Sequence, residues 1–107
     1  MNAEIKKEWV EALRSGKFIQ GRDLLRSRDK HCCLGVLCEI QSKHTGHKWE
    51  TALSDPNSFT FLDGFYGLGS RTLNWCDLKS TEALALASMN DKGSTFEEIA
   101  KYIEEKL

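Results

Sequence analysis

The nine residues from His31 to Glu39 constrain the fold of this chain more than any other segment. They read H-C-C-L-G-V-L-C-E, so three thiols and four apolar or glycine residues leave almost no polar side chain. Free cysteine is among the most frequently buried residue types, and it packs as a small hydrophobic group. Such a segment must be covered by the rest of the chain or must bind something. We expect it to form the central element of the core.

Length and charge indicate one domain without a strong overall attraction to nucleic acid. The chain has 107 residues, 40% of them hydrophobic, which suits a single core. Its 15 basic and 16 acidic side chains nearly cancel, so any anion site has to be local. We find no apolar run long enough to cross a bilayer and no secretory signal. We therefore expect no membrane partner, a cytoplasmic location, and reduced thiols at all four cysteines.

The first 30 residues predict a helix followed by a strand. Helical spacing of Ile5, Trp9, Ala12 and Leu13 indicates an amphipathic helix that ends at Ser15-Gly16. Residues 17–26 favour a strand, with Gly21 at a bulge or close backbone approach, and residues 27–30 favour a polar turn. A helix over residues 22–27 is the competing interpretation, because a short apolar pair does not decide between periods.

The remaining segments complete the expected architecture. Residues 32–42 predict a helix in which Gly35 packs closely against another element, with Trp9, Leu13, Ile99 and Ile103 as core partners. Residues 44–78 predict turns with short strands at 58–62 and 72–75. The next predicted helix is capped by Ser80 or Thr81 and runs to Met89, and its inward-facing residues are Leu84, Ala85 and Ala87 or Ser88. A capping box at Thr95 and Glu98 begins the last helix. The inner positions of that helix are Phe96, Ile99, Ala100 and Ile103. The fold class is α+β: one small domain, residues 1–107, of about four helices packed around a short strand or hairpin element.

Three groups of residues suggest a chemical role beyond simple packing. The C-terminal helix pair has the outline of a helix-turn-helix, but Glu97, Glu98, Glu104 and Glu105 would repel phosphate, so we expect no sequence-specific DNA partner. Cys33, Cys38, His44 and His47 suggest zinc, yet positions 33 and 38 point about 140° apart on a helix, so we expect no metal. Cys32 beside His31 at a helix start suggests a reactive thiol with a lowered pKa, although no orienting partner is identifiable.

The strongest charge asymmetry lies between Arg14 and His31. Six basic side chains face only Asp23 and Asp29 there, an excess of four positive charges. A solvated face is the simpler explanation, but an aromatic ring, an amide and glycine backbone interleave with the arginines, as suits a phosphorylated ligand. The middle aromatics Trp49, Phe65, Tyr66 and Trp75 would supply a stacking wall or pack in the core. The candidate ligand-binding residues are Lys17, Phe18, Gln20, Arg22 and Arg26.

Three blocks of the sequence carry a family resemblance. They read W-V-x-A-L-R-S-G-K at 9–17, C-C-L-G-V-L-C at 32–38 and N-D-x-G-x-x-F-x-x-I-A at 90–100. In this order they resemble a family of small proteins encoded by tailed phages and prophages. Residues 44–80 lie outside the resemblance, and Met89 stands where leucine is more usual. The resemblance implies a phage accessory protein without an assigned catalytic residue, of a kind that commonly disarms host defences by sequestering nucleotide signals or by blocking a host protein.

These observations favour binding over catalysis. No paired carboxylates, serine nucleophile elbow or phosphate-cradling glycine loop of the established patterns is present. We expect a non-enzymatic accessory protein, without a cofactor, that binds a phosphorylated or nucleotide-like small molecule in the host cytoplasm. The alternative is an interaction module that inhibits a host protein, and a cysteine- or metal-dependent activity is a third. For the oligomeric state, the sequence is compatible with both a monomer and a homo-oligomer.

Overall fold

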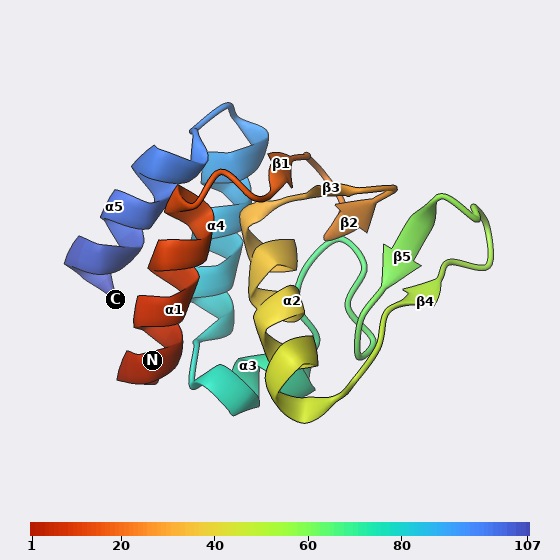
Figure 1. Cartoon of the computed structure of the whole chain (residues 1–107), viewed down its shortest axis with the longest axis horizontal. Coiled ribbons are helices and arrows are strands. Elements are labelled where there is room, and N and C mark those ends of the chain that lie inside the picture. Colours follow the sequence, from red (N-terminus) through yellow and green to blue (C-terminus); the bar gives the residue numbers. More distant parts are fainter.

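Five helices and five very short strands make up the fold (Figure 1). The structure is a computed structural model that describes residues 1–107. The helices are α1 (Ala3–Arg14), α2 (Cys33–Thr45), α3 (Ser70–Cys76), α4 (Ser80–Asp91) and α5 (Phe96–Lys106). The strands are β1 (Ile19–Gln20), β2 (Arg26–Ser27), β3 (Lys30–His31), β4 (Glu50–Thr51) and β5 (Ser58–Thr60). No helix is long and apolar enough to span a membrane.

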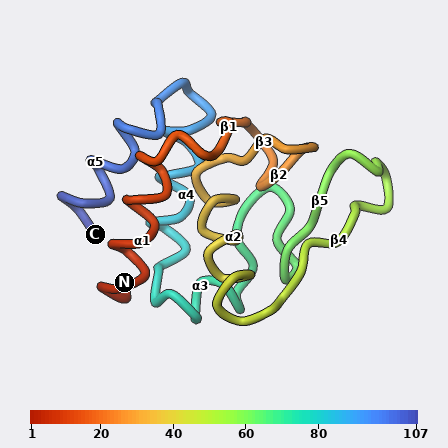
Figure 2. Tube along the Cα trace, viewed as in Figure 1, coloured from red at the N-terminus to blue at the C-terminus, as the bar shows by residue number.

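In the view of Figure 2, α2 lies between α1 and α4 on one side and β4 and β5 on the other. It packs against α1 and α4, while α5 packs on the far side of α1 and also contacts α4. The indole of Trp9 on α1 donates a hydrogen bond of 2.9 Å to the carbonyl of Cys33. Cys33, Leu37 and Cys38 are all fully buried. The expected central position of this segment is confirmed, although α4 and not α5 is its second helical neighbour.

The sheet combines strands that precede α2 in the sequence with strands that follow it, in the order β1-β3-β2-β5-β4. β1 pairs with β3 in parallel, and the other pairs are antiparallel. The predicted strand over residues 17–26 is therefore only partly correct, and the helix alternative for 22–27 is wrong. The chain leaves β1 at once because Asp23 adopts a left-handed backbone (φ 68°) and Leu25 turns fully into the core.

Gly35 sets the distance between α2 and the segment that enters β2. A Cβ at this position would lie 1.9 Å from the carbonyl oxygen of Leu25, so only glycine fits. That carbonyl accepts a hydrogen bond from the backbone amide of Cys32. The predicted close approach at Gly35 is confirmed, and its partner is backbone.

The middle of the chain contains a helix where a strand was expected. Residues 72–75 belong to α3, which ends at Asp77 in a left-handed conformation. Thr72 and Cys76 lie one turn apart and are both fully buried, so helical burial overrides the strand preference of Thr72. The other predicted strand is present in shortened form as β5, and its partner β4 was not anticipated.

The predicted cap is confirmed at α5 and wrong at α4, where Lys79 precedes the helix and Ser80 and Thr81 are its first two residues. Thr95 and Glu98 form the expected capping box at α5, with bonds of 3.1 and 2.9 Å. On α4, however, Leu84 is 69% exposed, and the buried side chains are those of Ala83, Leu86 and Asn90. The predicted inner stripe of α4 is therefore wrong, because the apolar residues of this helix are compatible with several faces.

Asn90 explains why α4 takes that orientation. Its fully buried side chain accepts hydrogen bonds from Gln20 Nε2 at 2.9 Å and from the backbone amide of Cys33 at 3.1 Å. Its own amide donates to the carbonyl of Gly21 at 2.8 Å. Cys32, the residue that precedes α2, supplies no side-chain cap, so Asn90 satisfies the first turn of α2 from a distant part of the sequence.

Replacing Asn90 with alanine tests this connection. Asn90→Ala leaves the amide of Cys33 and the carbonyl of Gly21 buried without their partner, and we expect the free energy of unfolding to fall by about 3 kcal/mol. Asn74→Ala, a change at an exposed amide of α3, should alter it by less than about 0.5 kcal/mol. Urea denaturation measures both. Equal stability of the two variants would contradict the role given to Asn90.

A second pair of variants tests the core position of α2. Leu37 is fully buried, so Leu37→Ala should lower the free energy of unfolding by about 2–5 kcal/mol. Leu84→Ala makes the same chemical change at an exposed site, where we expect less than about 0.5 kcal/mol. Chemical denaturation distinguishes them, and a loss below about 1 kcal/mol at Leu37 would show that the segment is peripheral.

Candidate functional site

His31 lies at the centre of an aromatic cluster on the small sheet. It belongs to β3 and is buried. Its ring meets Phe18 at a centroid distance of 5.3 Å and Trp49 at 5.9 Å, both edge to face. In the sheet register it is opposite Gln20 on β1 and Arg26 on β2. Residues from four separate segments therefore meet around this imidazole.

Arg26 is held in a defined orientation beside His31. Its Nε donates a hydrogen bond of 2.8 Å to the carbonyl of Arg28. Its Cζ lies 4.2 Å from the ring centroid of Phe59 and 5.6 Å from that of Trp49. The two terminal nitrogens have no hydrogen-bond partner in the protein and are not buried. The half-buried guanidinium thus presents a fixed fork of donors to an anion.

Glu39 on α2 completes the cluster from the other side. Its Oε2 lies 3.7 Å from His31 Nε2, and its Oε1 accepts a hydrogen bond from the Trp49 indole. Both ring nitrogens of His31 are buried without a hydrogen-bond partner. Burial lowers the pKa of His31, Glu39 acts against this, and the charge of Arg26 lowers the pKa further. The ring is therefore neutral in the fold near pH 7.

The five predicted site residues fall into two groups. Phe18 and Arg26 lie against His31, and Lys17 is exposed next to Phe18. Gln20 instead donates to Asn90 Oδ1 and to the carbonyl of Ser94, at 2.9 and 2.8 Å, so its amide group has a structural role. Arg22 is exposed, and its Nη2 would lie 3.6 Å from a Cβ at Gly93 in the turn before α5. The structure does not bring all five residues together.

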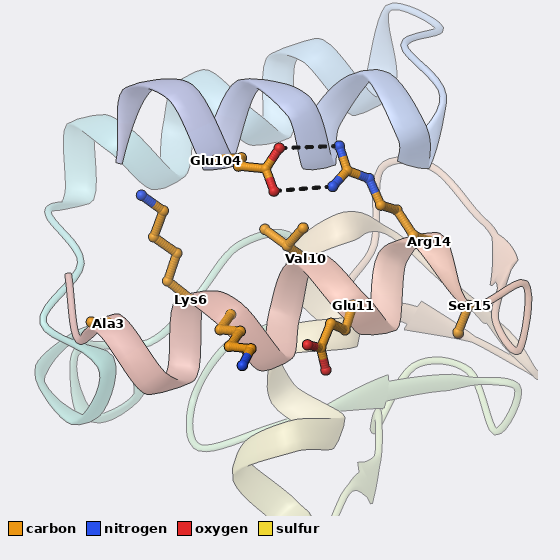
Figure 3. Close-up of a pocket in the computed structure, with 8 residues that line it drawn as sticks. Ala3, Lys6, Val10, Glu11, Arg14, Ser15 and Glu104 are labelled. Carbon is orange, nitrogen blue, oxygen red and sulfur yellow. Dashed lines mark hydrogen bonds and ion pairs between the residues drawn. The ribbon is translucent and has the colours of Figure 1, made fainter.

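Arg14, which contributes to the basic excess, is committed to an interhelical ion pair. Its Nε lies 3.0 Å from Glu97 and its Nη1 lies 3.1 Å from Glu104, so that it joins α1 to α5. Figure 3 shows the contact with Glu104. These contacts hold the pKa of Arg14 above its usual value. None of the other five cations of the segment takes part in an ion pair. They are Lys17, Arg22, Arg26, Arg28 and Lys30.

The surface of the protein has four cavities, and none of them is lined by Arg22, Arg26 or Gln20. The largest, about 610 Å³, is the groove between α1 and α5 drawn in Figure 3. A cavity of about 330 Å³ between α1 and α2 borders Phe18 and Glu39. An apolar one of about 260 Å³ lies beside α4, and another of about 250 Å³ borders His44 and Trp75. The guanidinium of Arg26 therefore faces open surface.

Among the middle aromatics, only Trp49 joins the cluster. Phe65 packs with Tyr66 at a centroid distance of 4.7 Å, and Trp75 lies near His44 at 6.3 Å. The predicted stacking wall is thus reduced to Trp49. Two contributors, Glu39 and Phe59, were missed. In the sequence, Glu39 looks like any charged residue at the edge of a helix's buried face. Phe59 lies opposite Arg26 only because β2 pairs with β5, and residues near Phe59 in the sequence do not indicate that pairing.

The cysteine and zinc alternatives receive no support from the arrangement of their residues. All four cysteines are buried free thiols. Burial raises the pKa of Cys32 to about 11, so the predicted lowering by the start of the helix is wrong. His44 bonds Glu8 at 2.7 Å and His47 bonds Thr45 at 2.7 Å. These histidines point away from the buried Cys33 and Cys38, and no group of potential metal ligands forms.

The buried neutral state of His31 predicts a pH dependence of stability. Because burial lowers the folded pKa below the unfolded value of about 6.5, the unfolded chain binds a proton more readily. The contribution of His31 is therefore complete above about pH 6.5 and is lost as the pH falls towards the folded pKa. Urea denaturation between pH 7.5 and 5 should show that the free energy of unfolding falls as the pH falls, both in the wild type and in His44→Gln. The same fall in His31→Phe would show that His31 is not its source.

Comparison with known proteins places the chain in one family. No similar curated protein and no similar solved structure was found. The family model described as "Domain of unknown function (DUF8296)" matches residues 1–107, which is the whole sequence. The match covers the helices, the sheet and the His31 cluster alike. The chain therefore belongs to the DUF8296 family.

Proposed function

We propose that this protein is a non-enzymatic binding protein that holds a phosphorylated, nucleotide-like ligand at Arg26. The observation that carries the proposal is the guanidinium itself, fixed by the Arg28 carbonyl and the Phe59 ring with both terminal nitrogens free. A fork fixed in this way loses little side-chain entropy when it binds a phosphate. The proposed activity requires no bond to be made or broken.

The surroundings of Arg26 suit an anion that carries a ring. Arg28 and Lys30 are exposed, unpaired cations in the same hairpin and add positive potential. Trp49 and Phe59 are half-buried, so each ring has surface left for stacking against a base. Phe18 and Lys17 extend the same surface beyond His31, whereas Arg22 and Gln20 lie towards the turn before α5.

A second candidate function rests on the openness of this surface. Because no cavity encloses Arg26, the same fork and cations also suit carboxylates on the surface of an acidic partner protein. The protein would then act as an interaction module. The two functions differ in whether a free nucleotide is enough to occupy the site.

The biological setting follows from the sequence resemblance. The blocks at 9–17, 32–38 and 90–100 support the proposal that this is a phage accessory protein that acts in the host cytoplasm against a defence system. Sequestration of a nucleotide signal and inhibition of a host protein are the two modes that correspond to the two candidate functions. The setting is a proposal by analogy with other small phage proteins.

Calorimetric titration against linear and cyclic nucleotides tests the leading function. We expect one or more of these to bind, and we expect Arg26→Ala to weaken binding by about 1.5–3 kcal/mol, roughly ten- to a hundred-fold. Arg26→Lys keeps the charge but loses the fork, so it should recover only part of the affinity. Arg71→Ala removes an exposed arginine of α3 and should leave the affinity unchanged.

Two outcomes would overturn this function. Nucleotide affinity that is equal in the wild type and in Arg26→Ala would place the site elsewhere. No heat with any nucleotide, together with capture of an acidic host protein that is lost in Arg26→Ala and kept in Arg71→Ala, would establish the second candidate instead.

A further inference from the structure

We propose that Arg26 and His31 form a proton-linked pair, in which binding of an anion at Arg26 is accompanied by uptake of a proton by His31. The affinity for the anion then rises as the pH falls. This inference rests on the proposed function for the location of the anion, and adds regulation by pH to that site.

The geometry couples the two side chains directly. Arg26 and His31 are opposite each other across the β2–β3 pair, where facing Cα atoms lie about 5 Å apart. Both side chains touch the same indole, with Arg26 Cζ 5.6 Å and the His31 ring 5.9 Å from the Trp49 ring centroid. A charge on either group is therefore felt by the other in a partly desolvated environment.

His31 has an unused capacity for a proton. Both ring nitrogens are buried and neither has a hydrogen-bond partner, so one of them can accept a proton without breaking a bond within the protein. Three charged groups face the ring: Glu39 from α2, Asp29 from the β2–β3 turn, and Arg26 from β2. The other packing partners, Phe18 and Trp49, carry no charge.

The balance among these groups favours a linked proton. Without a ligand, burial and the positive charge of Arg26 keep the imidazole neutral. An anion on the free nitrogens of Arg26 offsets that charge and removes one of the two obstacles. In the protonated ring the Nε2–H faces the Glu39 carboxylate, 3.7 Å away, which stabilises the added positive charge. Linkage is reciprocal, so protonation of His31 strengthens anion binding by the same factor.

The test uses probes whose own charge is constant between pH 8 and 5.5. A phosphate monoester loses charge in this range because its second pKa is about 6, so inorganic sulfate and a 3′,5′-cyclic nucleotide are used instead. We expect the affinity of the wild type to rise about fivefold or more from pH 8 to 5.5. The rise should vanish in His31→Phe and persist in His44→Gln, which removes a histidine near the opposite end of α2.

Nuclear magnetic resonance titration of the histidine rings gives a second readout that does not require His31→Phe to fold. Saturating sulfate should raise the pKa of His31 in the wild type, and Arg26→Gln should raise it without any ligand. Binding that is independent of pH would overturn the proton linkage and leave the proposed function standing. No binding of either probe at any pH would overturn both, and an unchanged His31 titration in Arg26→Gln would overturn the coupling alone.

Discussion

The hydrogen bonds of the Asn90 carboxamide are the interaction on which the rest of this structure depends. From the last turns of α4, this one buried side chain contacts the amide of Gln20, the carbonyl of Gly21 and the first turn of α2. Two-residue strands have too few ladder bonds to persist alone, and the N-terminus of α2 has no side-chain cap from its own segment. Because unpaired buried amides are costly, the end of β1, the start of α2 and the end of α4 are stable only together.

The candidate site follows from that connection. β3 runs directly into α2, so the position of the first turn of α2 also sets the position of His31. Two turns further along, the same helix brings Glu39 to within 3.7 Å of the imidazole. Gly35 lets the Leu25 segment lie against α2, and this segment leads into Arg26. A half-buried cation, a buried base and a carboxylate are thereby placed around one indole, which is the arrangement that charge coupling between them needs.

Local sequence features predicted two of the side chains that the structure places around His31. An aromatic residue and an arginine within a basic segment predicted Phe18 and Arg26, and both lie against His31. Gln20 has the same local signature, yet its amide is used by Asn90 and Ser94. A polar side chain in a basic segment looks the same whether its partner is a ligand or a distant part of the chain. Glu39 and Phe59 could not be found in this way, because their relevance comes only from helix and strand neighbours remote in sequence.

The sequence by itself determined the features that depend on neighbours within a few residues. The spacing of Trp9 and Leu13 predicted α1, and Gly16 predicted where this helix ends. The capping box at Thr95 and Glu98 predicted the start of α5, and the apolar run at 32–38 predicted a central helix. Only the tertiary structure decided that residues 72–75 are helical, that Leu84 faces outward and that Asn90 faces inward. The physical reason is that these conformations depend on which buried groups find a packing or hydrogen-bond partner across the core. Those partners come together only in the folded chain.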